Sequence, residues 1–299
     1  MIPRISNRLL RAGLLALTLS LVNGAGRAES GEPEPGDTLT VMTYNLRFAS
    51  ATPPNAWPQR RPLMREVITQ ISPDVFGTQE GLYGQLQDLA TDLQDYNWIG
   101  VGRDDGRRKG EFMAIFYRRA RLESLSTNYF WLSDTPEVPG STTWGNENRR
   151  MVTAVKFRDL RTRRIFCFWD THFDHQVQLA REKSAALVRK RISALPSSVP
   201  LLLVGDFNAV AGQNRAYHAL VDDGFLVDTW KLAKQRGGED VDTFNGFKDI
   251  VREGHRIDWI LARGEVVVDR EEIVTFSKEG QFPSDHFPLV AKLRFAAEK

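Results

Sequence analysis

The chain has one cysteine, only five histidines and no long apolar run. The single cysteine, Cys167, cannot form a disulfide within the chain, so stability must come from the hydrophobic core. The longest apolar stretch, residues 12–22, is shorter than the roughly 20 residues that span a bilayer. The 299 residues, 41% apolar and 26% charged, fit one large or two small soluble globular domains.

The first 28 residues are predicted to be a secretory signal peptide. Three arginines precede the apolar stretch and small residues follow it, with cleavage expected after Ala25 or Ala28. The alternative is an uncleaved membrane anchor. Residues 29–37, rich in Glu, Pro and Gly, are predicted to be a linker, and residues 38–299 the folded domain. We therefore expect a secreted or periplasmic protein with no stable membrane anchor after cleavage.

The chain also lacks an excess of basic residues. Residues 1–28 hold four of the 40 basic side chains and no acidic one, so the remainder carries 36 basic and 38 acidic side chains. Proteins that bind nucleic acid mainly through its phosphates usually carry an evident basic excess. Nucleic acid is therefore a possible but not a favoured partner.

Apolar periodicity predicts alternating strands and helices. A charge run between Gly102 and Gly110 is typical of a solvated surface loop. Helices are expected over residues 57–71, 83–93, 177–194 and 215–221, and strands over residues 39–44, 75–80, 112–117, 121–130, 151–157, 164–170, 201–204, 255–261 and 289–293.

The most informative stretch is residues 201–209, where four large apolar residues precede a glycine and then Asp206 and Asn208. Such a run suits a strand buried on both faces, with the polar pair at its end. In an extended segment, positions i and i+2 point the same way, so both side chains could share one pocket. The alternative is an Asx-type turn after the strand.

Polar side chains recur at other predicted strand ends. Asn45 and Glu80 close the first two strands, although a strand cap and a solvated loop residue are the alternatives. Two histidines and an aspartate follow a later strand within four residues, where a structural His–Asp pair is the alternative. Asp258 lies in a strand-like segment and needs a partner if buried. We expect these residues to meet at one rim: Asn45, Glu80, His172, Asp206, Asn208, Asp258, Asp285 and His286.

Residues 131–150 are predicted to be a long irregular loop, and ordered loops of this length are often functional. Arg149 and Arg150 beside Trp144 suit an anionic ligand with a flat or sugar-like part. The alternative is a surface flap.

These residue types match the metal-assisted hydrolysis of a phosphate ester. A hard divalent ion takes carboxylate, water and phosphate oxygens, and Glu80 is the best candidate ligand, with Asn45 and Asp285 near it. A histidine with a carboxylate partner can act as a base or as a donor to phosphate. Zinc fits less well, because only His172 and His175 are close in the sequence. A serine hydrolase is excluded by the lack of a Gly-x-Ser-x-Gly elbow.

Six short motifs occur along the chain: Met-Thr-Tyr-Asn-Leu-Arg at 42–47, Thr-Gln-Glu at 78–80, Thr-His-Phe-Asp-His at 171–175, Gly-Asp-Phe-Asn-Ala at 205–209, Arg-Ile-Asp-Trp-Ile at 256–260 and Ser-Asp-His-Phe-Pro-Leu at 284–289. In this order they resemble the endonuclease/exonuclease/phosphatase family, whose fold is that of deoxyribonuclease I. The resemblance runs from about residue 39 to 295 and implies an α/β fold, a four-layer sandwich of two packed, mainly antiparallel sheets flanked by helices. The sequence is most similar to a bacterial exported subgroup of that family.

The resemblance also implies roles for metal-binding and substrate-binding residues. It implies that Glu80 ligates Mg²⁺ or Mn²⁺, with Asn45 beside the ion and Asp285 close enough to contribute. The run of residues 146–150 departs from the family, in which a single arginine often precedes the strand, so both Arg149 and Arg150 are candidates for contact with substrate.

Five catalytic roles follow from the same resemblance. Asp206 is expected to position or activate the attacking water, and Asn208 to hold that water or the phosphate. His286, oriented by Asp258, and His172 are expected to contact the scissile phosphate. Metal and donors would then stabilise the charge that grows on the phosphate oxygens.

The sequence therefore predicts a secreted, Mg²⁺- or Mn²⁺-dependent phosphoric ester hydrolase. Its expected substrate is a phosphodiester or phosphomonoester, with a sugar or lipid phosphate favoured, and it is expected to be a monomer. One alternative is an extracellular nuclease that cleaves DNA or RNA. Another is a catalytically silent binding module that has kept the fold.

Overall fold

The computed structural model describes residues 37–296. The predicted signal peptide and all of the predicted linker except Asp37 lie outside these residues. Within residues 37–296, no helix has the length and apolar character needed to cross a membrane.

Seven strands form the first sheet, in the order β10-β12-β13-β1-β2-β4-β3. Most neighbours run antiparallel, but β1 and β2 are parallel, as are β10 and β12. The strands are β1 (Leu39–Asn45), β2 (Val75–Leu82), β3 (Tyr96–Ile99), β4 (Glu111–Arg118), β10 (Gln235–Gly237), β12 (Val266–Ile273) and β13 (Leu289–Phe295).

Six strands form the second sheet, in the order β5-β6-β7-β8-β11-β9. Only β7 and β8 are parallel neighbours. The strands are β5 (Leu122–Trp131), β6 (Met151–Asp159), β7 (Ile165–His172), β8 (Leu201–Asp206), β9 (Val227–Asp228) and β11 (Asp258–Arg263).

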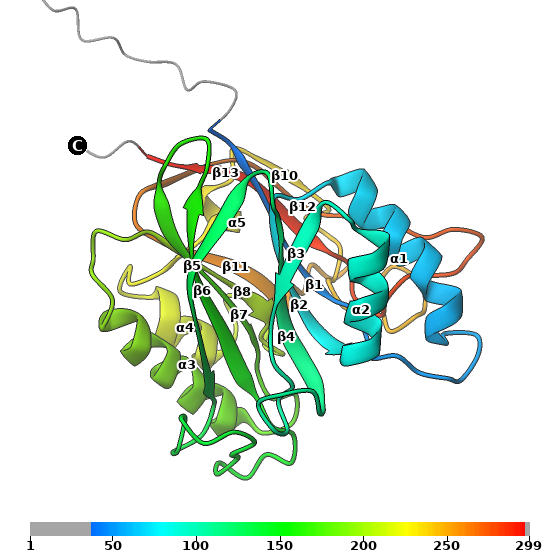
Figure 1. Ribbon diagram of the computed structural model, residues 1–299, viewed down its shortest axis with the longest axis horizontal. Coiled ribbons are helices and arrows are strands. Elements are labelled where there is room, and N and C mark those ends of the chain that lie inside the picture. Colours follow the sequence, from blue (N-terminus) through cyan, green and yellow to red (C-terminus); the bar gives the residue numbers. More distant parts are fainter. Residues whose placement is uncertain (1–36, 297–299) are drawn as a thin grey trace, which may run out of the picture. The chain divides into compact units, whose positions relative to one another are not determined.

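The helices α1 to α4 lie on the outer faces of the two sheets (Figure 1), whereas the short α5 contacts β11 and β12, one strand from each sheet. Helices α1 and α2 pack on the seven-stranded sheet, and α3 and α4 pack on the six-stranded sheet. The helices are α1 (Trp57–Ile71), α2 (Tyr83–Asp92), α3 (Gln178–Ser193), α4 (Arg215–Val221) and the single turn α5 (Thr229–Leu232). The order of layers is therefore helices, sheet, sheet, helices.

Three apolar cores separate these four layers. The middle core joins the inner faces of the sheets, for example Val41 and Ile115 with Phe168 and Val204. Strands such as β8 contribute to two cores at once, because Leu203 faces the helices while Val204 faces the other sheet. This explains why the sequence of β8 is apolar without alternation.

The predicted fold class is confirmed: two mainly antiparallel mixed sheets form a sandwich flanked by helices. α1 occupies the predicted residues 57–71, and α3 and α4 lie within one residue of the prediction at each end. The predicted strand at residues 255–261 begins only at Asp258.

Candidate active site

Polar side chains converge where several central strands end. In the six-stranded sheet, Asp206 at the end of β8 lies opposite His172 of β7 on one side and Asp258 of β11 on the other. In the seven-stranded sheet, β13 begins beside the end of β1, so the segment before it brings His286 next to Asn45. Neighbouring strands of both sheets thus supply one site.

Glu80 is aimed into the site by an irregularity in β2. The pairing of β2 with β4 shifts register between Thr78 and Gly81, and Glu80 between them has a φ of 63°. A positive φ is uncommon for a residue with a side chain and persists where the surroundings hold it. Such bulges re-aim a side chain next to active sites.

The segment after β8 was expected to be extended, but the structure differs. The strand ends at Asp206, and Asn208 has a φ of 49°, so the segment is not extended. The backbone N–H of Asn208 donates to Asp206 Oδ1 at 2.9 Å, which is an Asx-type turn. Both side chains nevertheless line the same cavity.

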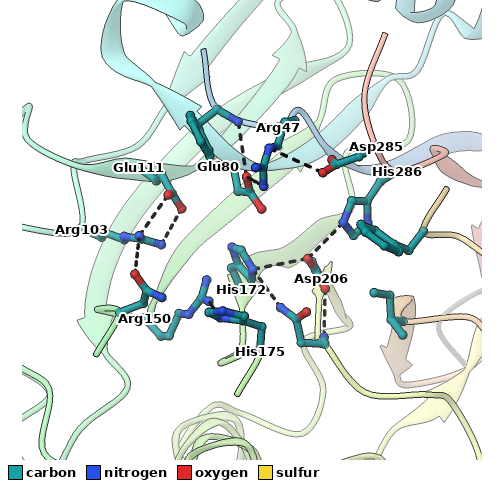
Figure 2. Close-up of a pocket in the computed structure, with 15 residues that line it drawn as sticks. Arg47, Glu80, Arg103, Glu111, Arg150, His172, His175, Asp206, Asp285 and His286 are labelled. Carbon is teal, nitrogen blue, oxygen red and sulfur yellow. Dashed lines mark hydrogen bonds and ion pairs between the residues drawn. The ribbon is translucent and has the colours of Figure 1, made fainter. Parts of the chain in front are cut away.

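This cavity has a volume of about 520 Å³, within the usual range for small-molecule sites. Figure 2 shows His172 and Asp206 between two groups of side chains, Asp285 and His286 on one side and Arg103 and Glu111 on the other. The lining residues are Arg47, Phe48, Glu80, Arg103, Glu111, Asn148, Arg150, His172, His175, Asp206, Asn208, Phe244, Ile257, Asp285 and His286.

Asn45 links the predicted metal-binding and catalytic groups. Its Nδ2 donates to Glu80 Oε1 and to Asp206 Oδ2, each at 3.0 Å, and lies 3.5 Å from His286 Nε2. Its Oδ1 accepts from the backbone N–H of Arg47 at 2.9 Å. Asn45 thus directs its amide nitrogen to the acidic groups and its oxygen to the backbone of Arg47, and its role as a metal ligand stays a prediction.

Two histidines flank Asp206. His286 Nδ1 lies 3.0 Å from Asp258 Oδ2, which orients the ring, and its Nε2 lies 3.7 Å from Asp206 Oδ2. His172 Nε2 lies 3.0 Å from Asn208 Nδ2 and 3.4 Å from Asp206 Oδ2. Asp258 does not line the cavity and reaches it only through His286.

Burial and neighbouring charge set the protonation of these groups. Burial and the guanidinium of Arg150 lower the pKa of His172 well below its usual value, so this ring is neutral. Burial also lowers the pKa of His286, but the carboxylates of Asp258 and Asp206 outweigh it and raise that pKa to about 10. Burial raises the pKa of Asp206 above its usual value, although the charge of His286 opposes this. The site therefore pairs a cationic donor with an unusually basic carboxylate.

The acidic groups fit a hard divalent cation. Arg47 lies between two carboxylates, 3.5 Å from Glu80 Oε2 and 3.6 Å from Asp285 Oδ2, so this corner of the cavity draws positive charge. Burial raises the pKa of Glu80, but the hydrogen bond from Asn45 and the positive charges of His286 and Arg47 together outweigh it, so this pKa lies below its usual value and the carboxyl is ionised. Oxygen donors of this kind suit Mg²⁺ or Mn²⁺.

A second grouping of potential ligands shares Glu80. Ligand atoms of Glu80, His172 and Asp206 lie within 4.8 Å of one another, as do those of Asp206, Asp258 and His286. Glu80 with Asp206 and His172 is therefore a second candidate position for an ion, beside the one between Glu80 and Asp285.

Arg150 brings positive charge to the cavity. Its guanidinium is buried, with Nη2 3.1 Å from His175 Nδ1 and Nε 3.6 Å from Asp174 Oδ2. Among the described residues, its Nε and Nη1 have no hydrogen-bond acceptor. A buried cation with unused donors is costly, which favours an anion beside it.

The other two predicted substrate-binding residues lie elsewhere. Trp144 is buried against α3, and its Nε1 donates to Asp134 Oδ1 at 2.7 Å. Arg149 is half exposed, and its Nε donates to the carbonyl of Gly140 at 3.0 Å. Neither residue lines the cavity, because Trp144 packs into the outer core and Arg149 points along the surface loop.

Sequence reasoning missed three charged residues of the cavity wall, Arg47, Arg103 and Glu111. Arg103 lies in the charge run predicted to be a solvated loop, yet it is only 8% exposed. Glu111, the first residue of β4, receives two hydrogen bonds from it. The available signal was that Glu111 opens an apolar strand directly after this charge run.

The chain also matches the profile of a known protein family. The profile of the Endonuclease/Exonuclease/phosphatase family matches residues 42–286, so the chain belongs to this family. Its members are hydrolases, generally dependent on a divalent metal, and the protein therefore has the fold of a phosphoesterase.

Relatives with solved structures and one viral protein are similar to this chain. A family protein from Bacteroides thetaiotaomicron is 36% identical, with a TM-score of 0.83 over 88% of this chain and 96% of that one. A mannosyl-6-phosphatase from the same organism is also 36% identical, with a TM-score of 0.81 over 86% of this chain and all of that one. An uncharacterised protein of Acanthamoeba polyphaga mimivirus is 28% identical, and the match covers 58% of this chain and 63% of the viral protein.

Proposed function

We propose that the protein is a secreted or periplasmic, Mg²⁺- or Mn²⁺-dependent phosphoesterase that acts on a sugar or lipid phosphate, with a sugar phosphate favoured. The observation that carries this proposal is the convergence of Glu80, His172, Asp206 and His286 on one cavity. These are the groups that metal-assisted attack of water on a phosphate ester requires.

The choice of substrate class rests on two further points. A relative with 36% identity is named as a mannosyl-6-phosphatase, and that chain is covered in full by the match. The cavity walls carry charged and amide groups, including Arg103, Glu111 and Asn148. Such walls suit a polar leaving group better than an acyl chain.

Binding of the phosphate is assigned to cationic donors. Both His286, whose Nε2 lies 3.7 Å from Asp206 Oδ2, and Arg150 line the cavity. Asn208 keeps His172 oriented through their 3.0 Å contact. Donors fixed before the reaction stabilise charge on the phosphate without reorganisation.

Hydrolysis then follows as a substitution at phosphorus. Asp206 accepts a proton from the attacking water, a new P–O bond forms, and the bond to the leaving oxygen breaks. The alkoxide takes a proton from solvent and departs as the alcohol, and the proton on Asp206 returns to solvent. A divalent ion held by Glu80 and Asp285 would supply charge that stabilises the phosphate and leaving oxygens.

A panel of phosphate esters tests this function. The protein is assayed with Mg²⁺, Mn²⁺ or a chelator on mannose 6-phosphate, p-nitrophenyl phosphate, bis-p-nitrophenyl phosphate and plasmid DNA. We expect metal-dependent release of phosphate from a monoester or cleavage of the small diester. A folded protein that turns over none of these esters would leave the binding module as the better account.

The plasmid DNA in this panel tests the alternative that the protein is an extracellular nuclease. Cleavage of plasmid DNA that is lost in Glu80→Gln would favour an extracellular nuclease. The lack of a basic excess over residues 29–299 argues against that outcome.

Export is proposed on residues 1–28 alone. Amino-terminal sequencing of the protein recovered from cells that express the whole chain tests it. A new terminus after Ala25 or Ala28 is expected, and an intact Met1 would refute cleavage.

A further inference from the structure

The wall of the cavity opposite Asp285 and His286 is formed by an interlocked pair, Arg103 and Glu111 (Figure 2). Arg103 donates Nη1 to Glu111 Oε2 at 2.5 Å and Nη2 to Oε1 at 3.0 Å. The same Nη2 lies 3.4 Å from Asn148 Oδ1. These contacts join the segments that carry the three residues into one polar wall.

The wall is rigidly supported. Trp131, at the end of β5, donates its indole N–H to the carbonyl of Arg103 at 2.6 Å. The loop is further closed by the backbone N–H of Arg103, which donates to the carbonyl of Glu111 at 2.9 Å. Side chains held in this way present their hydrogen-bonding groups in a fixed plane, which is what specific recognition requires.

We propose that Arg103, Glu111 and Asn148 form a subsite that binds hydroxyl groups of the leaving alcohol, as in a sugar ring, next to the scissile phosphate. This inference rests on the proposed phosphoesterase function and names the part of the substrate that the enzyme recognises.

The chemistry of the wall matches hydroxyl groups. A guanidinium only donates, a carboxylate only accepts and an amide does both, whereas a hydroxyl both donates and accepts. Neighbouring hydroxyls of a sugar can therefore each bond to two members of this wall. The contacts with Arg103 and Glu111 would involve a charged partner, which gives strong and directional hydrogen bonds.

The charge of the wall disfavours a second phosphate. Glu111 neutralises Arg103 through their paired hydrogen bonds, and its carboxylate would repel another anion at this end of the cavity. A neutral, hydroxyl-rich group meets neither problem. The ring of Phe48 also lines the cavity and offers apolar surface for the C–H groups of a sugar.

The test compares two monoesters that share a phosphate and differ in hydroxyl groups, mannose 6-phosphate and p-nitrophenyl phosphate. Glu111→Gln keeps the shape of the side chain and removes its charge and one acceptor oxygen. We expect the ratio of the kcat/KM values, sugar ester over phenyl ester, to fall about tenfold to a hundredfold, as for the loss of a charge-assisted hydrogen bond. The loss should appear mainly in KM for the sugar ester.

Glu123→Gln is the matched control. Glu123 on β5 also accepts from an arginine, Arg158, at 2.7 Å, but this pair lies outside the cavity. The control should leave the ratio of the two kcat/KM values unchanged. A change of the same size in both variants would overturn the subsite.

A second measurement does not depend on the folding of a variant. With the wild-type protein, monodeoxy analogues of mannose 6-phosphate should include at least one with a kcat/KM about tenfold or more below the parent. Glu111→Gln should distinguish that analogue from the parent less well than the wild type does. Equal kcat/KM values for all analogues would overturn the subsite.

The remaining outcomes separate this inference from the proposed function. Equal losses on both esters in Glu111→Gln, or wild-type turnover of the phenyl ester without the sugar ester, would overturn the subsite and leave the phosphoesterase function standing. Wild-type turnover of neither ester, nor of the diester, would overturn the proposed function and this inference with it.

Discussion

Replacement of Asp258 by asparagine tests the charge state on which the proposed chemistry depends. Asp258 is fully buried and lies 3.0 Å from His286 Nδ1. The asparagine side chain is nearly the same size and could still accept from that ring nitrogen, so the change removes charge more than shape. The variant therefore separates the electrostatic role of Asp258 from its role in orienting the ring.

The size of the effect follows from Coulomb's law. Unit charges at this separation attract by about 5 kcal/mol at an effective dielectric constant of about 20, and about 1.4 kcal/mol corresponds to one pKa unit. Loss of the charge should therefore lower the pKa of His286 from about 10 by about three to four units, to about 6 or 7. At pH 8 about 1 to 10 per cent of the variant would carry the cation.

The assay is the release of phosphate as a function of pH at saturating Mg²⁺. Because the positive charge of His286 strengthens its hydrogen bond to phosphate, the alkaline limb of the variant's profile should move to lower pH. The activity relative to wild type should then be about tenfold to a hundredfold lower at pH 8 than at pH 6. Asp222→Asn is the control, since Asp222 pairs with His218 at 2.8 Å on the surface. A loss that is equal at every pH would refute this reasoning.

Three further predictions concern other parts of the molecule. Burial raises the pKa of Glu271 to about 8, so the folded protein holds a proton that the unfolded chain loses, and stability falls as pH rises from about 5 to 8. Glu271→Gln should flatten this dependence and be more stable than wild type at pH 9, by about 1–3 kcal/mol in denaturant unfolding, and a variant with the wild-type pH dependence would contradict this. Arg150→Ala should lower kcat/KM by about a hundredfold or more, whereas Arg149→Ala should stay within about threefold, and similar losses in both would contradict the placement of these two arginines. Gly205→Ala should destabilise by about 3 kcal/mol or more in the same unfolding assay, because its Cβ would lie 2.1 Å from the carbonyl oxygen of Thr171, and a change below about 1 kcal/mol would show that β7 and β8 can separate.

Much of the fold was predictable because local pattern decided it. α1 matches its apolar stripe, and β8 reads as a strand buried on both faces. β12 was not predicted, because its second half, Asp-Arg-Glu-Glu, has the composition of a loop and the strand carries a register shift between Val268 and Arg270. β9 and β10 contain two and three residues, too few to show any period.

The residues of the candidate site also divide into those that the sequence pattern predicts and those that it does not. Residues at strand ends, such as Glu80 and His286, could be predicted because strand ends follow from the apolar pattern. Arg103 could not be predicted, because its surroundings in the sequence are those of a charged surface loop. Only its pairing with Glu111, at the start of β4, holds this side chain at the cavity. The orientation of Asn45 was equally out of reach, because a backbone N–H two residues later decides which side of its amide faces the acidic groups.

The most direct test of the account is a crystal structure of the protein soaked with Mn²⁺ and inorganic phosphate, with the ion located by anomalous scattering. The account predicts Mn²⁺ within about 2.5 Å of the carboxylate of Glu80, with the phosphate in contact with Asp206 and His286. Manganese found only at Asp242, Glu253 and His255, a cluster of potential ligands outside the cavity, with no phosphate beside Asp206, would contradict it.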